Sequence, residues 1–257
     1  MNPSLLPTTF DTGFVALSFL ISAVGAFVAL TAAGRIAAAH ERINRINLLA
    51  AGLALGGIGI WSMHFIGMLA LRIPLGIAYA VVETVVSLVI AVAATAYALF
   101  TVARHPGSVR HVLAGGAVLG LAVCAMHYLG MYGMRFGGHF EWNGALVAAS
   151  VGIAWVAATA ALAIMSVVRN VPARVAASLV MATAVCAMHY TGMAAAGFVC
   201  TVPNPLAMPG GTGVVSSFDL PVLVTIVALG SAFVISVDQF FQRVNGARTL
   251  RTARAMR

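Results

Sequence analysis

A chain of 257 residues with 61% hydrophobic and 8% charged residues lies outside the composition range of soluble domains. All fourteen basic residues are arginine, and the net charge of +8 would by itself allow nucleic-acid binding. These arginines, however, lie between and after long apolar runs, where a membrane protein carries the charges that set its topology. The composition therefore predicts an integral membrane protein whose partner is the lipid bilayer, with no nucleic-acid partner.

Seven apolar segments are long enough to cross a bilayer core as helices, which takes roughly 20 residues. They are 14–34, 48–71, 78–102, 112–134, 144–168, 175–197 and 220–240. The connections after the first, third, fifth and seventh segments carry twelve arginines, and the other connections carry two. By the positive-inside rule the twelve face the cytoplasm, which places the N-terminus outside and the C-terminus inside.

A short motif, Met-His-aromatic-x-Gly-Met, recurs in the second, fourth and sixth segments at 63–68, 126–131 and 188–193. The spacing of its histidines, 63 and then 62 residues, indicates an internal repeat. We expect a helix pair whose second member carries the motif, present three times, with a seventh helix added. The predicted fold is thus an all-α, seven-span membrane domain over residues 1–241, followed by a basic cytoplasmic tail over 242–257.

The motif histidines are expected at one depth in the outer part of the membrane. His64 and His127 each lie eight residues before an arginine at the outer end of the segment, Arg72 and Arg135, and Gly197 stands near this place in the third copy. Eight helical residues span about 12 Å. The three histidines can therefore come together in the folded bundle.

Methionines accompany these histidines on the same helix face, because residues four apart share a face. The candidate metal ligands are His64 with Met68, His127 with Met131, and His189 with Met193. Imidazole and thioether together suit soft or borderline metals, above all copper. The alternative is that the histidines form hydrogen bonds between helices while the methionines fill gaps in the packing.

Further sulfur atoms lie close to each motif. Additional candidate ligands are Met63, Met126, Met188, Cys124 and Cys186. The three methionines point about 100° away from their histidines and would have to reach the site of a neighbouring helix. The two cysteines lie three residues before a histidine and share its face, as Trp61 does in the first copy, although a buried membrane cysteine is usually inert.

Other features of the chain allow two interpretations each. Glu83 is expected either to accept a hydrogen bond from a ligating histidine or to reach towards the outer interface. The loop 200–219, rich in proline and glycine, is either a cover over the motif ends or a linker, and the linker is slightly favoured. Since there is no nucleophile with its base, phosphate loop or zinc-hydrolase motif, the sequence predicts no catalytic residues and no enzyme.

With these motifs and this topology, the chain resembles the MHYT family, a bacterial integral membrane sensor domain named for the Met-His-Tyr-Thr that stands here at 188–191. The other copies read Met-His-Phe-Ile and Met-His-Tyr-Leu but keep the downstream Gly-Met. The resemblance implies the bacterial inner membrane, a copper site in the motif residues, and sensing of oxygen, carbon monoxide, nitric oxide or redox state. Family members often continue into cyclic-di-GMP enzymes, kinases or DNA-binding domains; this chain carries none, so we expect it to signal through a separate cytoplasmic protein.

Two other functions use the same residues. A copper transport or metal-handling protein would use the His-Met ladder as a path, which should place ligands at several depths rather than at one. A haem protein would use two facing histidines as iron ligands.

Overall fold

The computed structural model describes residues 5–36 and 43–255, with side chains up to Gln242 and at Val244. Arg42, one of the predicted topology-setting arginines, lies outside the described residues, as do the side chains of the tail arginines. Within the described part, seven helices are long and apolar enough to cross a membrane. The prediction of a multi-pass membrane protein with seven helical spans is therefore confirmed.

Six of the spans begin and end within four residues of the predicted segments, whereas α8 continues 15 residues past the predicted end of the seventh. The spans are α1 (Thr12–Ala33), a continuous span made of α2 (Arg45–Gly52), η1 (Leu53–Ser62) and α3 (Met63–Leu69), then α4 (Val81–Arg104), α5 (Val109–Tyr132), α6 (Gly144–Val167), α7 (Val171–Ala194) and α8 (Leu220–Ala255). Four helix starts are capped by side chains, since Asp11, Asn44, Asn143 and Asn170 accept hydrogen bonds from the first backbone amides of α1, α2, α6 and α7.

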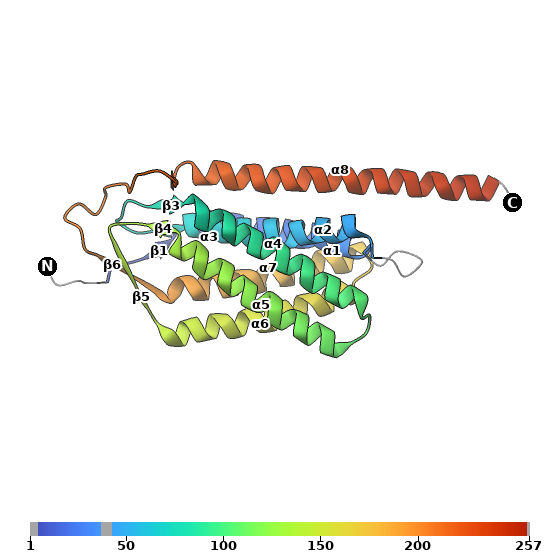
Figure 1. Cartoon of the computed structure of the whole chain (residues 1–257), viewed down its shortest axis with the longest axis horizontal. Helices are drawn as coiled ribbons and strands as arrows, with labels where there is room; N and C mark the ends of the chain where they lie inside the picture. The colour runs from blue at the N-terminus through green and yellow to red at the C-terminus, as the bar shows by residue number, and fades with distance from the viewer. Residues whose placement is uncertain (1–4, 37–42, 256–257) are drawn as a thin grey trace.

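Six of the spans form a closed ring. Helix α1 packs against both η1 and α7, α4 packs against η1 and α5, and α6 packs against α5 and α7. The motif-bearing spans alternate around this ring, so that α3, α5 and α7 can meet in its middle. Helix α8 lies outside the ring against η1 and α3 and continues well past the bundle (Figure 1).

Glycines bring the second span very close to its neighbours. A Cβ atom at Gly25 of α1 would lie 2.3 Å from the backbone nitrogen of Gly59, and one at Gly56 would lie 2.5 Å from the carbonyl oxygen of Ala91 in α4. Such close contacts are possible because the glycines have no side chain, as in other membrane helix pairs. They explain why this span is the most buried of the seven.

The middle of the second span is a π-helix of ten residues, η1, which is rare and was not predicted. In keeping with the wider turn of a π-helix, the side-chain hydroxyl of Ser62 donates a hydrogen bond to the carbonyl of Gly57, five residues earlier. The indole of Trp61 donates to Thr84 and Ser87 of α4. Trp61 thus points to α4 instead of sharing the face of His64, as an α-helix had predicted.

Short strands at one end of the bundle, here called the strand end, extend each helix pair into a larger repeat. The strands are β1 (Thr9–Phe10), β2 (Leu71–Arg72), β3 (Ala78–Ala80), β4 (Met134–Arg135), β5 (Gly138–Trp142), β6 (Ala196–Cys200) and β7 (Val214–Ser216). Strand β1 pairs with β2, β3 with β4, and β5 with β6, all antiparallel. Each repeat is therefore strand, helix, motif helix, strand, and the two strands close it.

The loop before α8 takes part in this layer. Strand β7 pairs with β3, the amide of Gly76 donates to the carbonyl of Pro205, and the amide of Val81 donates to that of Gly213. The loop 200–219 is therefore held against the second repeat at several points. The preference for a mere linker was wrong, because backbone hydrogen bonds in this loop are made without any pattern in its sequence.

At the opposite end, polar side chains hold α8 to the ring. Asn47, only 1% exposed, accepts a hydrogen bond from the Gln239 amide of α8 and donates to Gln242 Oε1. The guanidinium of Arg35, which follows α1, donates to Gln239 Oε1. Gln242 in turn donates to Asp238, the residue expected near the end of the seventh span. We call these five residues the Asn47 cluster.

Candidate metal centre

The three motif histidines meet at the centre of the ring. The Nδ1 atom of His64 lies 3.1 Å from that of His127 and 3.1 Å from that of His189, and the last two are 3.3 Å apart. Each residue is 1% exposed. The prediction that the three repeats bring their histidines together is confirmed, and we call this group the histidine triad.

The motif glycines make room for these rings. A Cβ atom added at Gly130 would lie 2.3 Å from His64 Nε2. A Cβ atom added at Gly192 would lie equally close to His127 Nε2, and one added at Gly67 equally close to His189 Nε2. Each histidine therefore leans on the glycine of another motif, in a cyclic order. The sequence signal for this role was the glycine three residues after every histidine, which had been noted in the motif but given no function.

The donor atoms of the triad suit a cation. A neutral imidazole carries one N–H and one lone pair, so three Nδ1 atoms in mutual contact cannot all be joined donor to acceptor. At least one pair must set lone pair against lone pair or proton against proton. A cation that accepts three Nδ1 lone pairs removes this conflict, and imidazole is the commonest metal ligand in proteins.

The geometry limits which other residues can join. Among the described histidines, cysteines and acids, the group close enough to hold one ion consists of His64, His127 and His189 alone. Cys124 and Cys186 are not in this group; each lies three residues before its histidine, about 4.5 Å away along the helix axis. The two cysteines are free thiols on the side of the triad away from the strand end.

The methionines surround the triad at different levels. Met68, Met131 and Met193 are at most 2% exposed, and each lies one turn beyond its histidine towards the strand end. Met63 and Met126 are also buried, while Met188 lines an apolar cavity on the other side of the triad. Ligation by any thioether stays a prediction.

Glu83 has a different partner from the one expected. Its carboxylate forms an ion pair with Arg135, the arginine eight residues after His127. The first repeat has an equivalent pair, in which Asp11 accepts a hydrogen bond of 2.9 Å from Arg72. Glu83 therefore joins the start of α4 to β4. Of its two expected roles, acceptance of a hydrogen bond from a motif histidine was wrong.

The tyrosines of the second and third motifs attach their helices to the next helix of the ring. The hydroxyl of Tyr128 shares a hydrogen bond of 2.6 Å with Ser150 of α6, and that of Tyr190 shares one of 2.9 Å with Ser18 of α1. Phe65 has no hydroxyl, and the equivalent Ser87 of α4 is bonded by Trp61 instead. Three buried serines thus orient the helices that carry the triad.

Comparison with known proteins agrees with this repeated architecture. The family described as "Bacterial signalling protein N terminal repeat", MHYT, matches residues 57–116 and 120–178. The two matched segments contain His64 and His127, and the structure adds His189 as the third member. The chain belongs to the MHYT family. No solved structure matches it.

Relatives of this MHYT chain are signalling proteins. It is 32% identical over 240 residues to the bifunctional diguanylate cyclase/cyclic di-GMP phosphodiesterase MucR, and 36% identical over 203 residues to the cyclic di-GMP phosphodiesterase NbdA, both of Pseudomonas aeruginosa. It is 28% identical over 226 residues to the signaling protein YkoW of Bacillus subtilis. The alignments cover 91%, 76% and 85% of this chain but only 34%, 25% and 28% of the relatives. The chain thus matches a membrane sensor portion of about a third of their length or less.

Proposed function

We propose that this chain is a copper-containing sensor of the bacterial inner membrane that responds to a diatomic gas or to redox state. The observation that carries the proposal is the contact of three buried imidazole nitrogens, one from each repeat. Imidazole binds copper in either oxidation state, and the soft thioethers of Met68, Met131 and Met193 one turn away favour Cu(I). Bound copper would supply one-electron and O₂ chemistry that no side chain of the chain offers.

The protein's own residues prepare the site. The motif glycines fix the direction of the three rings, and the burial of the triad excludes water. A low-dielectric surrounding favours a cation of lower charge over one of higher charge. With Glu83 engaged by Arg135, no carboxylate of the described residues is available to draw a hard cation to the triad.

The alternatives receive less support from the same geometry. A haem would have to part three rings whose Nδ1 atoms are 3.1 to 3.3 Å apart. A transport path should place ligands at several depths, whereas the three histidines that could hold one ion lie together at one level.

We propose further that the sensor affects cyclic-di-GMP signalling, through a domain of the same protein or through a separate cytoplasmic partner. The names of two relatives suggest this output. Helix α8 is the suitable connection, because it touches the second span and then continues beyond the membrane-spanning part to Ala255. In this proposal residues 1–241 form the membrane domain and residues 242–257 a basic cytoplasmic tail, with the N-terminus outside.

Metal analysis of the detergent-purified protein after reconstitution with Cu(I) tests the metal site. We expect bound copper in the wild type and a sharp loss in His127→Ala, while His139→Ala, at an exposed histidine of β5, should bind as the wild type does. Met131→Leu should retain metal but shift it towards Cu(II), at a packing cost below about 1.5 kcal/mol. Undiminished copper in a His64/His127/His189 triple alanine variant would return these residues to a packing role.

A further inference from the structure

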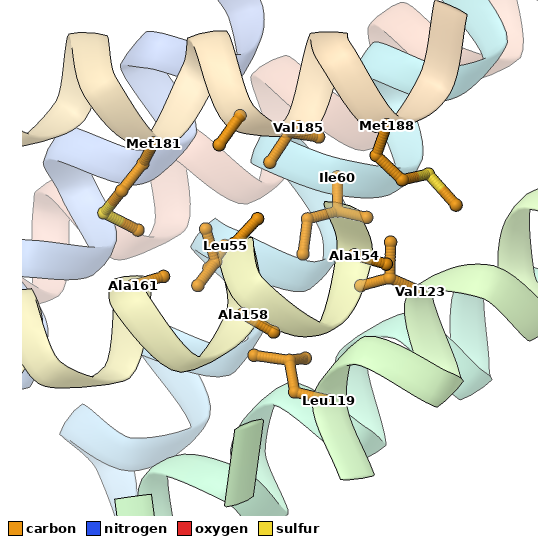
Figure 2. A pocket seen from close by; sticks show the side chains of 12 residues that line it. Leu55, Ile60, Leu119, Val123, Ala154, Ala158, Ala161, Met181, Val185 and Met188 are labelled. Carbon is orange, nitrogen blue, oxygen red and sulfur yellow. The ribbon is translucent and has the colours of Figure 1, made fainter. Parts of the chain in front are cut away.

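A small cavity lies between four helices of the ring, and Figure 2 shows the apolar side chains that line it. Its volume is about 40 Å³, and its walls come from η1, α5, α6 and α7. Two wall residues fix its position: Met188 directly precedes His189, and Val123 lies four residues before His127. On α5 the lining runs from Leu119 to Val123, eight to four residues before His127, so the cavity extends from about 6 to about 12 Å from the level of the triad.

The lining determines what the cavity can hold. All twelve lining residues are alanine, valine, leucine, isoleucine or methionine. A buried water needs two to four polar partners and about 10–15 Å³ of such space, so this cavity has the room but not the partners. Its contents must therefore be neutral and apolar, and only two or three heavy atoms in size.

The cavity approaches the lipid between α6 and α7. On this side its walls are Ala157 and Ala161 of α6 and Ala184 and Val185 of α7, all of them half-buried. Three of these four side chains are a single methyl group, so the wall between the cavity and the bilayer is thin. Apolar solutes favour hydrocarbon over water, and the membrane is thus the richer source for them.

We propose that this cavity is a binding site for a neutral diatomic gas taken up from the bilayer between α6 and α7. The site holds the gas one to two helical turns from the triad, on the side away from the strand end. As a route for the sensed ligand, this inference rests on the proposed sensor function. As a binding site, it rests only on the volume, the lining and the position of the cavity.

Xenon is the probe, because it is apolar, monatomic and enters dry protein cavities. Xenon NMR of the detergent-purified full chain should show saturable binding in the wild type. Ala161→Leu places three extra carbon atoms into the cavity and should abolish this binding. Ala160→Leu makes the same change one residue away on the exposed face of α6 and should leave binding intact. Ala184→Leu fills the cavity from α7 and should also abolish xenon binding, so it replaces Ala161→Leu in the test if that variant does not fold.

The outcomes separate the cavity from the metal site. No saturable xenon binding in the wild type, or equal binding in the folded Ala161→Leu or Ala184→Leu protein, would show that the cavity is a packing void without a ligand. The triple alanine variant of the triad keeps every lining residue, so it should still bind xenon after losing its metal. Copper binding without xenon binding would overturn the gas site alone, and xenon binding without copper would overturn the proposed metal alone.

Discussion

Gly130→Ala adds one methyl group at the point where the second motif receives His64. The added Cβ would lie 2.3 Å from His64 Nε2, whereas ordinary contacts begin at 3.4 Å. The imidazole must therefore move by about 1 Å, several times the roughly 0.2 Å tolerance of a metal–ligand distance. We expect Gly130→Ala to lose most of the copper that the wild type binds.

Stability gives the same substitution a second readout. Alanine is favoured over glycine inside a helix by about 1 kcal/mol, but forcing a methyl into a full core costs typically 1–3 kcal/mol. The net effect on the free energy of unfolding should be a loss of up to about 2 kcal/mol. Gly152→Ala in α6 is the matched control, because nothing lies within 4 Å of its added Cβ, so it should be neutral or stabilising.

Metal content and thermal unfolding in detergent, measured for the wild type and both variants, test this reasoning. A Gly130→Ala protein that binds as much copper as the wild type would show that the glycine does not set the position of His64. A Gly152→Ala protein with the same copper loss would show that the effect comes from glycine in the helices generally.

Three further predictions concern other parts of the chain. Asn47→Ala leaves two glutamines of α8 without their partner, so we expect a loss of about 1–3 kcal/mol in the free energy of unfolding and faster proteolysis of α8, with exposed Asn204→Ala as the unaffected control. The hydrogen bond from Arg72 holds the pKa of the Asp11 carboxyl below its usual 3.8. The stabilisation by this pair is therefore fully present above pH 3.8 and is lost as the pH falls through the lowered pKa of the folded protein. Asp11→Asn should therefore flatten the acid side of the melting-temperature profile, and an unchanged profile would contradict the assignment. Finally, a reporter fused after Arg257 should be active only in its cytoplasmic form; activity in the extracytoplasmic form would reverse the orientation.

The sequence predicted the spans and the meeting of the histidines for different physical reasons. The spans follow from apolar length alone, which a bilayer selects regardless of neighbours. The triad follows from repetition, because three copies at one depth in three like helices must present their faces to a common axis or to lipid. Burying three polar rings together is the less costly of these arrangements.

Other features could not be predicted from patterns within one segment. Strands of two to five residues are too short for an alternating pattern, and their pairing joins positions such as Phe10 and Leu71 that only folding brings together. Within the π-helix, Gly56 and Gly59 lie against α4 and α1, and the Asn47 cluster joins polar residues about 190 positions apart. Two interpretations of Glu83 were left open because only its depth was known, and its partner, Arg135, had been treated only as a topology signal.

The cyclic contact of histidine and glycine has a consequence for how the site forms. Each ring is placed by the backbone of another repeat, so one helix pair, or even two, cannot hold the three nitrogens at 3.1 to 3.3 Å. The metal site can therefore form only when the whole ring of helices is closed, including the contact of α7 with α1 that joins the last repeat to the first.

A change in the positions of the three imidazoles must shift the helices that carry them. The second span, which holds His64, also contacts α8 along η1 and through Asn47. A shift at the triad thus has a continuous packed path to the helix that leaves the bundle, and Asn47→Ala should weaken that path without removing any residue of the triad.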